Sequence, residues 1–400
     1  MRTGVFVCSC GPNIGDRIDI EKIAEEVSKI EGVVLAETHG LLCSPDGKKY
    51  LASKIEGNKL ERVVIAACSP REHEETFMKV CETAELNPFM MQMANIREQV
   101  AWVTPDRNSA TQKALRLVRG AINRIIRHKP LEKTSIVCNP EVVIIGGGVA
   151  GMSVALVLAN ADRKITIIER SASLGGYPAN EKLVEHLAEK VAERSEITVI
   201  TGREPVEIVG FFGNFIINLD EDADEIKAGS IVLATGRSVD ESGRAVSPEG
   251  FREITEMLGI SADENAFPNR EHVSLAPVST LIDGVYVTGC AGGLCSLTEA
   301  VSRSEAVAGT ILSSLIPGRE VETEPKTSVI SETLCRGCKT CLEVCGYGAI
   351  SFDEERLVCT VNSVLCKGCG NCAGACPSGA VKAQHFTPDQ IRYQMAGLLR

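Results

Sequence analysis

The stretch EVVIIGGGVAGMSVALVLANADRKITIIER, residues 141–170, indicates how the middle of the chain folds. An apolar strand runs into Gly146, Gly148 and Gly151, which fill the pattern G-x-G-x-x-G, and an apolar helix and a second strand follow. In this pattern the first glycine makes a tight turn, the second lets the backbone approach a pyrophosphate, and the third lets the helix pack on the strand. Glu169 ends the second strand, where an acid binds the adenosine ribose of a dinucleotide. We therefore predict a Rossmann-type dinucleotide site, because a glycine-rich turn alone gives no reason for Glu169.

Three later segments indicate which dinucleotide is bound. Gly175 and Gly176 follow the acid closely, and SIVLATGR (230–237) and GVYVTGCAGG (284–293) are buried strands, the second leading into a helix predicted over 296–312. Such segments resemble those that complete the FAD domain of two-dinucleotide-binding flavoproteins, so the pattern favours FAD over NAD. The expected cofactor-binding residues are Gly146, Gly148, Val149, Ala150, Gly151, Glu169, Arg170, Gly175, Gly176, Thr235, Gly236, Gly289 and Cys290.

The second nucleotide domain of these flavoproteins, which binds NAD(P)H, has no counterpart in the sequence. Only 53 residues separate Gly236 from Cys290, and no second G-x-G-x-x-G occurs there. That length is too short for a second βαβαβ half. We therefore expect the flavin to exchange electrons with proteins rather than with a nicotinamide.

The tail of the chain carries one cysteine pattern twice. In LCRGCKTCLEVCGYGAI, residues 334–350, four cysteines follow the spacing C-x2-C-x2-C-x3-C, and each recurs 31 residues later. This is the spacing of bacterial ferredoxins with two [4Fe–4S] clusters, in which the fourth cysteine of each run binds the other cluster. On that rule one cluster takes Cys335, Cys338, Cys341 and Cys376. The other takes Cys366, Cys369, Cys372 and Cys345.

Other uses of these cysteines fit less well. Zinc knuckles pair their ligands as C-x2-C, which is not this pattern. Disulfides are disfavoured because the N-terminus has no secretory signal layout. The second run ends in Cys376-Pro377, the usual ending, but the first ends in Cys345-Gly346. We expect this difference to loosen that turn and to shift the potential of one cluster.

The bulk composition is that of an ordinary globular protein with several domains. Of 400 residues, 44% are hydrophobic and 24% are charged, enough for a sizeable core. A net charge of −11 argues against nucleic acid as a partner. No apolar run is long enough for a membrane span. The 17 cysteines, without a signal layout, indicate metal binding in a reducing cytoplasm.

Four cysteines near the N-terminus follow three predicted strands. GVFVCSCG (4–11) and RVVIAACSPREHEETF (62–77) each end an apolar strand on cysteine, and VVLAETHGLLCSPDG (33–47) places one in the loop after a strand. Ligands gather outside the carboxyl ends of parallel strands, so we expect these cysteines to converge on a third [4Fe–4S] cluster. The alternative is buried thiols that pack as small hydrophobes. The four are Cys8, Cys10, Cys43 and Cys68.

We assign no chemical role to three further cysteines, to His73 or to one basic helix. Cys81, Cys138 and Cys359 are interpreted as packed thiols, and His73 as a surface histidine. The helix predicted over 108–128 carries five Lys and Arg side chains that are interpreted as solvated, with an acidic docking partner as the alternative.

Several motifs occur together with the tail pattern: VFVCSCGPNIG, AACSPREHEETF, NPFMMQMANIREQVAWV, GGGVAGMSVAL and GVYVTGCAGG. In this combination the chain resembles the A subunit of heterodisulfide reductase over nearly its whole length, as a compact version of that family. The resemblance implies an oxidoreductase component that passes electrons between FAD and [4Fe–4S] clusters, with no catalytic residue of its own and with substrate chemistry in partner chains. It implies partners similar to the B and C subunits of that enzyme, a hydrogenase or dehydrogenase module, a ferredoxin, and a homodimer within a larger complex. Flavin-based electron bifurcation is a further implied activity.

The sequence departs from that family after the second glycine pair, and other functions stay open. Larger members insert a cysteine-bearing segment there, whereas residues 174–200 contain no cysteine. One alternative is a self-sufficient flavin-dependent disulfide reductase, for which the flavin domain offers only Cys290 and Cys295, spaced C-x4-C. Another is a non-catalytic iron–sulfur sensor or scaffold.

The expected fold class is α/β with an α+β tail. We expect a small α/β cluster domain over 1–130, an FAD-binding Rossmann-type domain over 139–317, and a two-cluster ferredoxin domain over 328–386. Residues 387–400 are expected to form a C-terminal tail.

Overall fold

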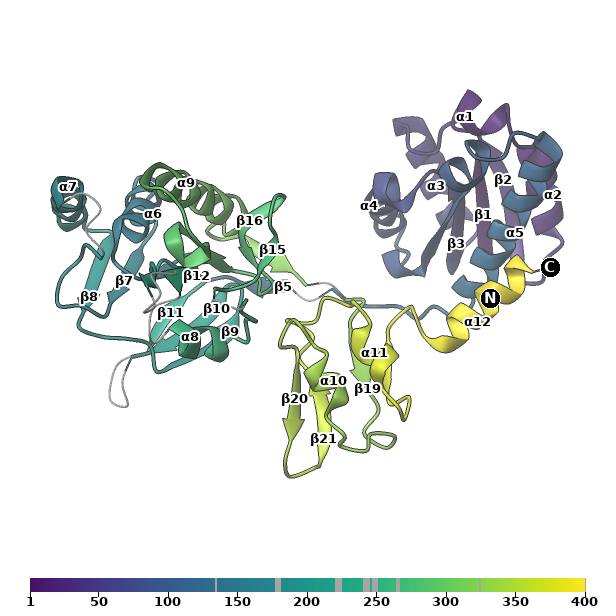
Figure 1. The fold of residues 1–400 in the computed structure, drawn as a ribbon. Coiled ribbons are helices and arrows are strands. Elements are labelled where there is room, and N and C mark those ends of the chain that lie inside the picture. Colours follow the sequence, from purple (N-terminus) through teal and green to yellow (C-terminus); the bar gives the residue numbers. More distant parts are fainter. Residues whose placement is uncertain are drawn as a thin grey trace. The chain divides into compact units, whose positions relative to one another are not determined.

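The structure is a computed structural model that describes residues 1–399 except 134, 177–180, 220–224, 240–244, 247–250, 264–266 and 324. The chain forms two compact units. The first contains Met1–Glu132 together with Lys382–Arg400, and the second contains Lys133–Val381. Figure 1 shows the elements of each unit.

The first unit is a parallel sheet covered by helices on both faces. Its four strands are ordered β2-β1-β3-β4. Helices α2 and α5 pack on one face, and α3 and α4 pack on the other (Figure 1). The strands are β1 (Thr3–Cys8), β2 (Val33–His39), β3 (Arg62–Ala67) and β4 (Met91–Asn95), and the helices are α1 (Pro12–Gly15), α2 (Ile20–Ser28), α3 (Pro45–Gly57), α4 (Pro70–Thr83) and α5 (Arg107–Ile125).

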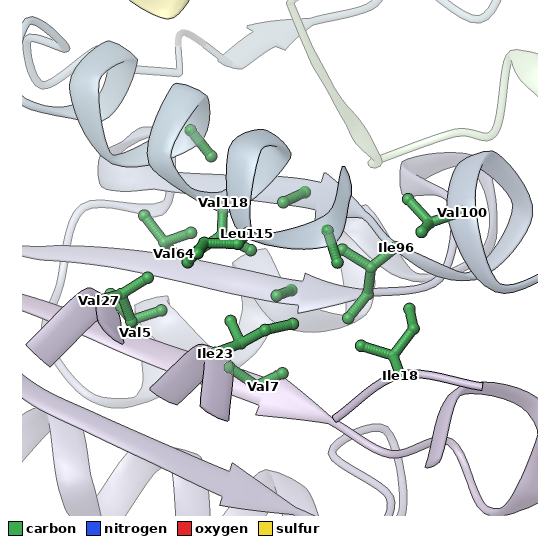
Figure 2. Packing of buried hydrophobic residues seen from close by; sticks show 14 of the residues in the cluster. Val5, Val7, Ile18, Ile23, Val27, Val64, Ile96, Val100, Leu115 and Val118 are labelled. Atoms are coloured by element: carbon green, nitrogen blue, oxygen red, sulfur yellow. The ribbon is translucent and has the colours of Figure 1, made fainter. Parts of the chain in front are cut away.

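Alternation along the strands explains the two cores of this unit. Val5 and Val7 of β1 face α2 and α5, whereas Phe6 between them faces α3 and α4. Figure 2 shows the first of these cores, where Leu115 and Val118 of α5 lie against the strands. Each fully buried aliphatic side chain contributes about 1.5–3 kcal/mol to folding, so the sheet holds its strand ends in place.

Side-chain caps define where the helices of this unit begin. Asp19, Ser44, Ser69 and Asp106 each accept a hydrogen bond from a backbone N–H in the first turn of α2, α3, α4 and α5. Proline follows the cap directly in α3 and α4, where its missing N–H costs nothing. In α3 and α4 the residue directly before the cap is a cysteine, Cys43 or Cys68.

The C-terminal helix α12 (Pro388–Leu398) packs on α5 within the same unit. Two glycines let the helix backbones approach, because a Cβ added at Gly397 would meet the Gly120 backbone at 2.8 Å. Arg124 of α5 donates hydrogen bonds to Gln394 (2.9 Å) and to the backbone oxygen of His385 (2.8 Å). Part of the basic face that the sequence presents on α5 is therefore occupied by the tail of the chain itself.

The second unit contains a seven-stranded sheet ordered β15-β16-β17-β12-β6-β7-β8. The strands from β17 to β8 are parallel, and β16 pairs antiparallel with β17. Helices α6 and α9 cover one face of the sheet. The strands are β6 (Val142–Ile145), β7 (Ile165–Glu169), β8 (Ile197–Thr201), β12 (Ser230–Leu233), β15 (Arg270–His272), β16 (Ala276–Thr280) and β17 (Val285–Val287), with helices α6 (Val149–Ala159), α7 (Glu181–Ala192) and α9 (Leu297–Ser314).

The other face of this sheet is covered by a small antiparallel sheet and one helix. Phe215 and Ile217 of the small sheet pack with Val143 and Ile145 of β6, and Phe251 of α8 joins the same core. These elements are β9 (Glu207–Phe211), β10 (Asn214–Asn218), β11 (Ile226–Ala228) and α8 (Phe251–Met257). Two short pairs complete the region: β5 (Ser135–Val137) with β18 (Glu320–Glu322), and β13 (Ser238–Val239) with β14 (Ala245–Val246).

The cysteine-rich segment of the second unit repeats its backbone as well as its sequence. Gly337 and Gly368 both have positive φ (66° and 63°), and so do Gly348 and Gly379 (59° and 67°), each pair being 31 residues apart. Helices α10 (Thr340–Glu343) and α11 (Asn371–Ala375) obey the same offset at their first residues. The strands of this segment are β19 (Ser328–Ile330), β20 (Ile350–Asp353), β21 (Val358–Val361) and β22 (Val381–Ala383). The duplication predicted from the cysteines therefore extends to the turns between them.

Among the described residues, no helix combines the length and apolar character that crossing a bilayer requires.

Candidate functional site

The glycine loop predicted from the sequence lies at the carboxyl end of β6, as a dinucleotide site requires. Gly146 has φ of +111°, a conformation that favours glycine over other residues. Its N–H donates a hydrogen bond to the backbone oxygen of Ile168 at 2.8 Å. A Cβ added at Gly151 would lie 2.0 Å from the Gly146 oxygen. Helix α6 then begins after Gly148 with no side-chain cap, which leaves its first N–H groups available to phosphate oxygens.

The second glycine pair closes on the first loop. The Gly175 N–H donates to the Gly147 oxygen at 2.9 Å, and a Cβ added at Gly176 would meet Gly148 Cα at 3.3 Å. Two separate loops thus meet through their backbones and form a glycine-lined cradle. A pyrophosphate fits such a cradle because it needs close N–H groups.

Glu169 lies at the end of β7 and is 6% exposed. Its carboxylate accepts hydrogen bonds from the N–H groups of Gly147 (2.7 Å) and Ser171 (2.8 Å). These contacts hold the acid against the glycine loop, where it can accept a hydrogen bond from a ribose hydroxyl.

A cavity opens beside this acid, and one polar atom in its wall has no partner. Gly146, Glu169, Arg170 and Thr235 line it together. The Thr235 hydroxyl is buried without a hydrogen bond, which is costly unless a bound group supplies one. Ile145 of β6 and Ile168 of β7 also line it. Sequence reasoning missed the other lining residues, which are Arg203, Glu204 and Pro205 after β8 and Phe251 and Ile254 of α8.

The remaining predicted cofactor residues lie around the same loop. Gly289, with φ of +57°, follows β17, and a Cβ there would meet the Ala150 side chain at 2.7 Å. Val149 is the first residue of α6. Gly236, with φ of +79°, is next to Thr235 and has open space where a Cβ would be. The predicted residues therefore surround one strand edge, and the observed cradle, acid and unpartnered hydroxyl fit FAD.

The four N-terminal cysteines gather at the carboxyl edge of the first unit's sheet. Cys8 ends β1 and Cys68 follows β3, and both are buried. Burial raises the pKa of the Cys8 thiol, and the charges of Cys10 and Cys43 raise it further. Burial, with contributions from Glu98 and Cys10, raises the pKa of Cys68 to about 11 against the opposing charge of Arg97. Each of the four thus lies within electrostatic range of another, as a shared ligand set requires.

A local signal for these positions is visible in the sequence once the structure is known. Both Cys43 and Cys68 stand directly before a Ser-Pro pair that starts a helix. The positive end of a helix dipole favours a nearby thiolate.

Arg97 and Glu98 adjoin the cysteines and were not singled out from the sequence. Arg97 starts a π-helical turn (Arg97–Ala101), a feature often found at functional sites. Its guanidinium donates to the Cys10 sulfur at 3.6 Å and pairs with the Glu98 carboxylate at 2.6 Å. A cation held there compensates the negative charge of thiolate ligands.

In the tail, Cys345 lies with the second cysteine run rather than with its own. One cavity is lined by Cys345 together with Cys366, Cys369 and Cys372. The Ala349 N–H donates to the Cys345 sulfur at 3.3 Å, and the Ser328 N–H donates to Cys366 at 3.4 Å. N–H groups aimed at sulfur are a feature of iron–sulfur sites, where they tune the potential.

The other half of the tail shows the reciprocal arrangement. Hydrogen bonds from Thr340 lower the pKa of Cys338, and the charge of Cys376 opposes that shift. Cys376 therefore lies within electrostatic range of Cys338. The described residues contain no three His, Cys, Asp or Glu side chains arranged around a single metal ion. A cubane has a different requirement, because each of its thiolates binds a separate iron atom.

The cysteines interpreted as packed thiols are buried. Cys81 is in α4, Cys138 lies against Gly213, and Cys359 is in β21. Burial, followed by the neighbouring Cys359, raises the pKa of Cys341 to about 12, so Cys359 packs beside a predicted ligand. His73 contacts Thr76 and Phe77 on its own helix.

Two domain families match the chain. The family described as pyridine nucleotide-disulphide oxidoreductase matches residues 123–304, and the family described as 4Fe-4S dicluster domain matches residues 334–380. The predictions of FAD and of [4Fe–4S] clusters are confirmed by these matches, as is the combination of a Rossmann-type domain with a ferredoxin domain.

Curated relatives support the resemblance to the A subunit of heterodisulfide reductase. The chain is 42% identical over 231 residues to the A subunit of the ferredoxin:CoB-CoM heterodisulfide reductase from Methanosarcina mazei, a match that covers 55% of this chain and 29% of that protein. It is 38% identical over 232 residues to the A subunit of the H(2):CoB-CoM heterodisulfide,ferredoxin reductase from Methanothermobacter thermautotrophicus, covering 55% and 35%. The matched region therefore spans about a third of the length of these relatives.

Solved structures resemble part of the chain. One is a thioredoxin reductase from Streptococcus pyogenes, 14% identical, with a TM-score of 0.35 over 44% of this chain and 98% of that one.

We expect Cys68→Ala to lower the iron content of the reconstituted protein from about 12 to about 8 atoms per chain, since one of three clusters would lose a ligand. Cys81→Ala is the matched control, because Cys81 is also a buried thiol of this unit but is interpreted as packing only. Iron and flavin are measured on the same samples, and flavin should not change. A wild-type protein that holds only about eight iron atoms would contradict the front cluster.

Proposed function

Because the chain is a relative of the A subunit of heterodisulfide reductase, we propose that it passes electrons between FAD and [4Fe–4S] clusters and on to partner proteins, as the electron-transfer component of a complex. The observation that carries the proposal is the presence in one chain of a dinucleotide cradle around Glu169 and a cavity that Cys345 shares with the second cysteine run. A bound flavin supplies the ability to exchange electrons singly or in pairs.

The residues of this chain then hold the carriers and set their surroundings. Gly146, Gly148 and Gly151 with Gly175 and Gly176 hold the pyrophosphate, and Glu169 binds the ribose. In the tail, Cys335, Cys338, Cys341 and Cys376 hold one cluster, and Cys366, Cys369, Cys372 and Cys345 hold the other. At the front, Cys8, Cys10, Cys43 and Cys68 hold a third cluster, with Arg97 offsetting its charge.

The partners in this proposal are proteins. Chains similar to the B and C subunits of heterodisulfide reductase would carry out the substrate chemistry, and a hydrogenase, dehydrogenase or ferredoxin would exchange electrons with this chain. The same carriers would serve flavin-based bifurcation, because the front cluster and the two tail clusters are separate acceptors for the two electrons of one flavin.

We expect that neither NADH nor NADPH will bleach the flavin of this chain rapidly under anaerobic conditions. The sequence between Gly236 and Cys290 offers no second glycine fingerprint for a nicotinamide dinucleotide. A reduced two-cluster ferredoxin, added in the same stopped-flow experiment, should bleach it instead. Rapid bleaching by NADH and none by ferredoxin would reject the electron-transfer proposal in favour of a nicotinamide-dependent reductase.

A further inference from the structure

Cys290 and Cys295 are two thiols that the proposed relay does not use as cluster ligands. Their sulfur atoms lie 3.4 Å apart, and the Cys290 thiol also faces the Cys295 backbone oxygen at 3.6 Å. A disulfide has an S–S distance of about 2.05 Å, so a small rotation about the side-chain bonds would bring the two sulfurs into bonding range. Both side chains are partly exposed, so a dissolved thiol or disulfide can reach them.

The loop that carries the pair is held firmly between β17 and α9. Arg303 of α9 donates hydrogen bonds to the backbone oxygens of Gly289 (3.2 Å) and Gly293 (3.4 Å) on either side of Cys290. Ser296, directly after Cys295, caps α9 in a reciprocal capping box with Glu299. These contacts lower the freedom of the two cysteines to separate, which favours a bond between them over two independent thiols.

The same loop rests on the cradle proposed for FAD. Gly289 packs on Ala150 at the start of α6, and the Ser304 hydroxyl of α9 donates to the Ala150 oxygen at 3.0 Å. The buried Thr288 hydroxyl is in hydrogen-bond contact with Ser304 at 3.1 Å. A redox change at the cysteine pair would therefore act on the turn that holds the dinucleotide.

Burial and the close neighbour keep Cys295 in its protonated form. Burial, followed by the neighbouring Cys290, raises the pKa of Cys295 to about 12. The positive charge of Arg303 opposes that shift. Disulfide exchange requires a thiolate, so the raised pKa of Cys295 predicts that exchange at this pair becomes faster as the pH rises.

We propose that Cys290 and Cys295 form a reversible dithiol–disulfide couple, a two-electron centre in addition to the flavin and the clusters. A small-molecule disulfide oxidises it in two exchange steps. The Cys290 thiolate attacks one sulfur and releases the first small thiol, and the Cys295 thiolate then displaces the second. In total, one disulfide and two protein thiols become one protein disulfide and two small thiols. This inference stands apart from the proposed relay and does not depend on it.

The mass of one tryptic peptide reports the redox state of this couple. Trypsin releases residues 271–303 as one peptide, which contains Cys290 and Cys295 and no other cysteine. The holoprotein is equilibrated anaerobically in glutathione buffers of graded reduced-to-oxidised ratio, alkylated and digested. The mass of the peptide then reports two alkylated thiols, an internal disulfide or a glutathione adduct. The peptide 80–97, whose only cysteine is Cys81, is the control for general oxidation.

We expect both cysteines to become protected from alkylation together, with an oxidised fraction that depends on the square of the reduced glutathione concentration divided by that of the oxidised form, and to recover fully on reduction. Cys290→Ser should leave Cys295 alkylated or glutathione-bound at every ratio, and Cys295→Ser should do the same for Cys290. Neither variant should lose iron. Two alkyl groups at every ratio, glutathione adducts without an internal disulfide in the wild type, or loss of iron in either variant would overturn the proposal.

Discussion

Gly151→Ala should yield a protein that has lost most of its FAD and kept its iron. The added Cβ would lie 2.0 Å from the backbone oxygen of Gly146, so the glycine loop and α6 would have to separate. Forced overpacking of this kind costs about 1–3 kcal/mol. If that cost falls on the bound state, FAD affinity drops about 5- to 150-fold. Flavin released by unfolding and total iron are measured on the same preparation.

Gly309→Ala is the matched control for this variant. Gly309 lies in α9 of the same unit, and a Cβ added there meets nothing within 4 Å. The substitution should therefore leave flavin content unchanged and stabilise the helix by up to about 1 kcal/mol. A Gly151→Ala protein with its full complement of FAD would show that the loop around Gly146 does not hold the cofactor.

Cys345→Ser should abolish the EPR signal of the cluster held by the second cysteine run, not that of its own run. Cys345 lines the cavity of Cys366, Cys369 and Cys372, so a serine there removes the fourth thiolate of that cluster. Cys376→Ser should abolish the other signal. Each variant therefore loses one of two tail clusters, about four of the eight tail iron atoms.

Cys338→Ser and Cys369→Ser identify which signal belongs to which run. The crossover rule exchanges only the fourth cysteine of each run, so these two ligands bind the cluster of their own run. The spectra of the dithionite-reduced proteins are compared directly. The crossover predicts that Cys376→Ser matches Cys338→Ser and that Cys345→Ser matches Cys369→Ser. If Cys345→Ser matches Cys338→Ser instead, each run binds its own cluster.

The sequence predicted best those features that short spacings determine. The strand predicted before Gly146 is observed as β6, Val142–Ile145, and the helix predicted over 296–312 is observed as α9, Leu297–Ser314. Both follow from local patterns, an apolar run ending in glycine and a serine cap before an amphipathic stretch. The duplicated cysteine spacing similarly predicted a duplicated backbone.

Features that depend on contacts between distant segments were not predictable in the same way. The packing of α12 on α5 rests on Gly120 and Gly397, which belong to no recognisable motif until the two helices meet. The wall of the dinucleotide cavity includes Arg203 and Phe251, which no motif marks. Arg97 reaches Cys10 across 87 positions, and no spacing rule covers that distance.

The proposed function implies that the tail clusters lie on the route by which a protein donor reduces the flavin. Cys338 and Cys369 are the exposed ligands of the two runs, whereas Cys341 and Cys372 are buried. A Cys338→Ser, Cys369→Ser protein should therefore lose both tail clusters with less damage to the surrounding core than a variant of the buried pair.

The most direct measurement is anaerobic stopped-flow reduction of the flavin in the wild type and in this double variant. Each is mixed with a reduced two-cluster ferredoxin and, separately, with dithionite. We predict that the variant slows reduction by ferredoxin at least about tenfold, the effect of about 1.4 kcal/mol on a barrier, and leaves reduction by dithionite unchanged. Equal rates with ferredoxin in the two proteins would contradict electron transfer through the tail clusters.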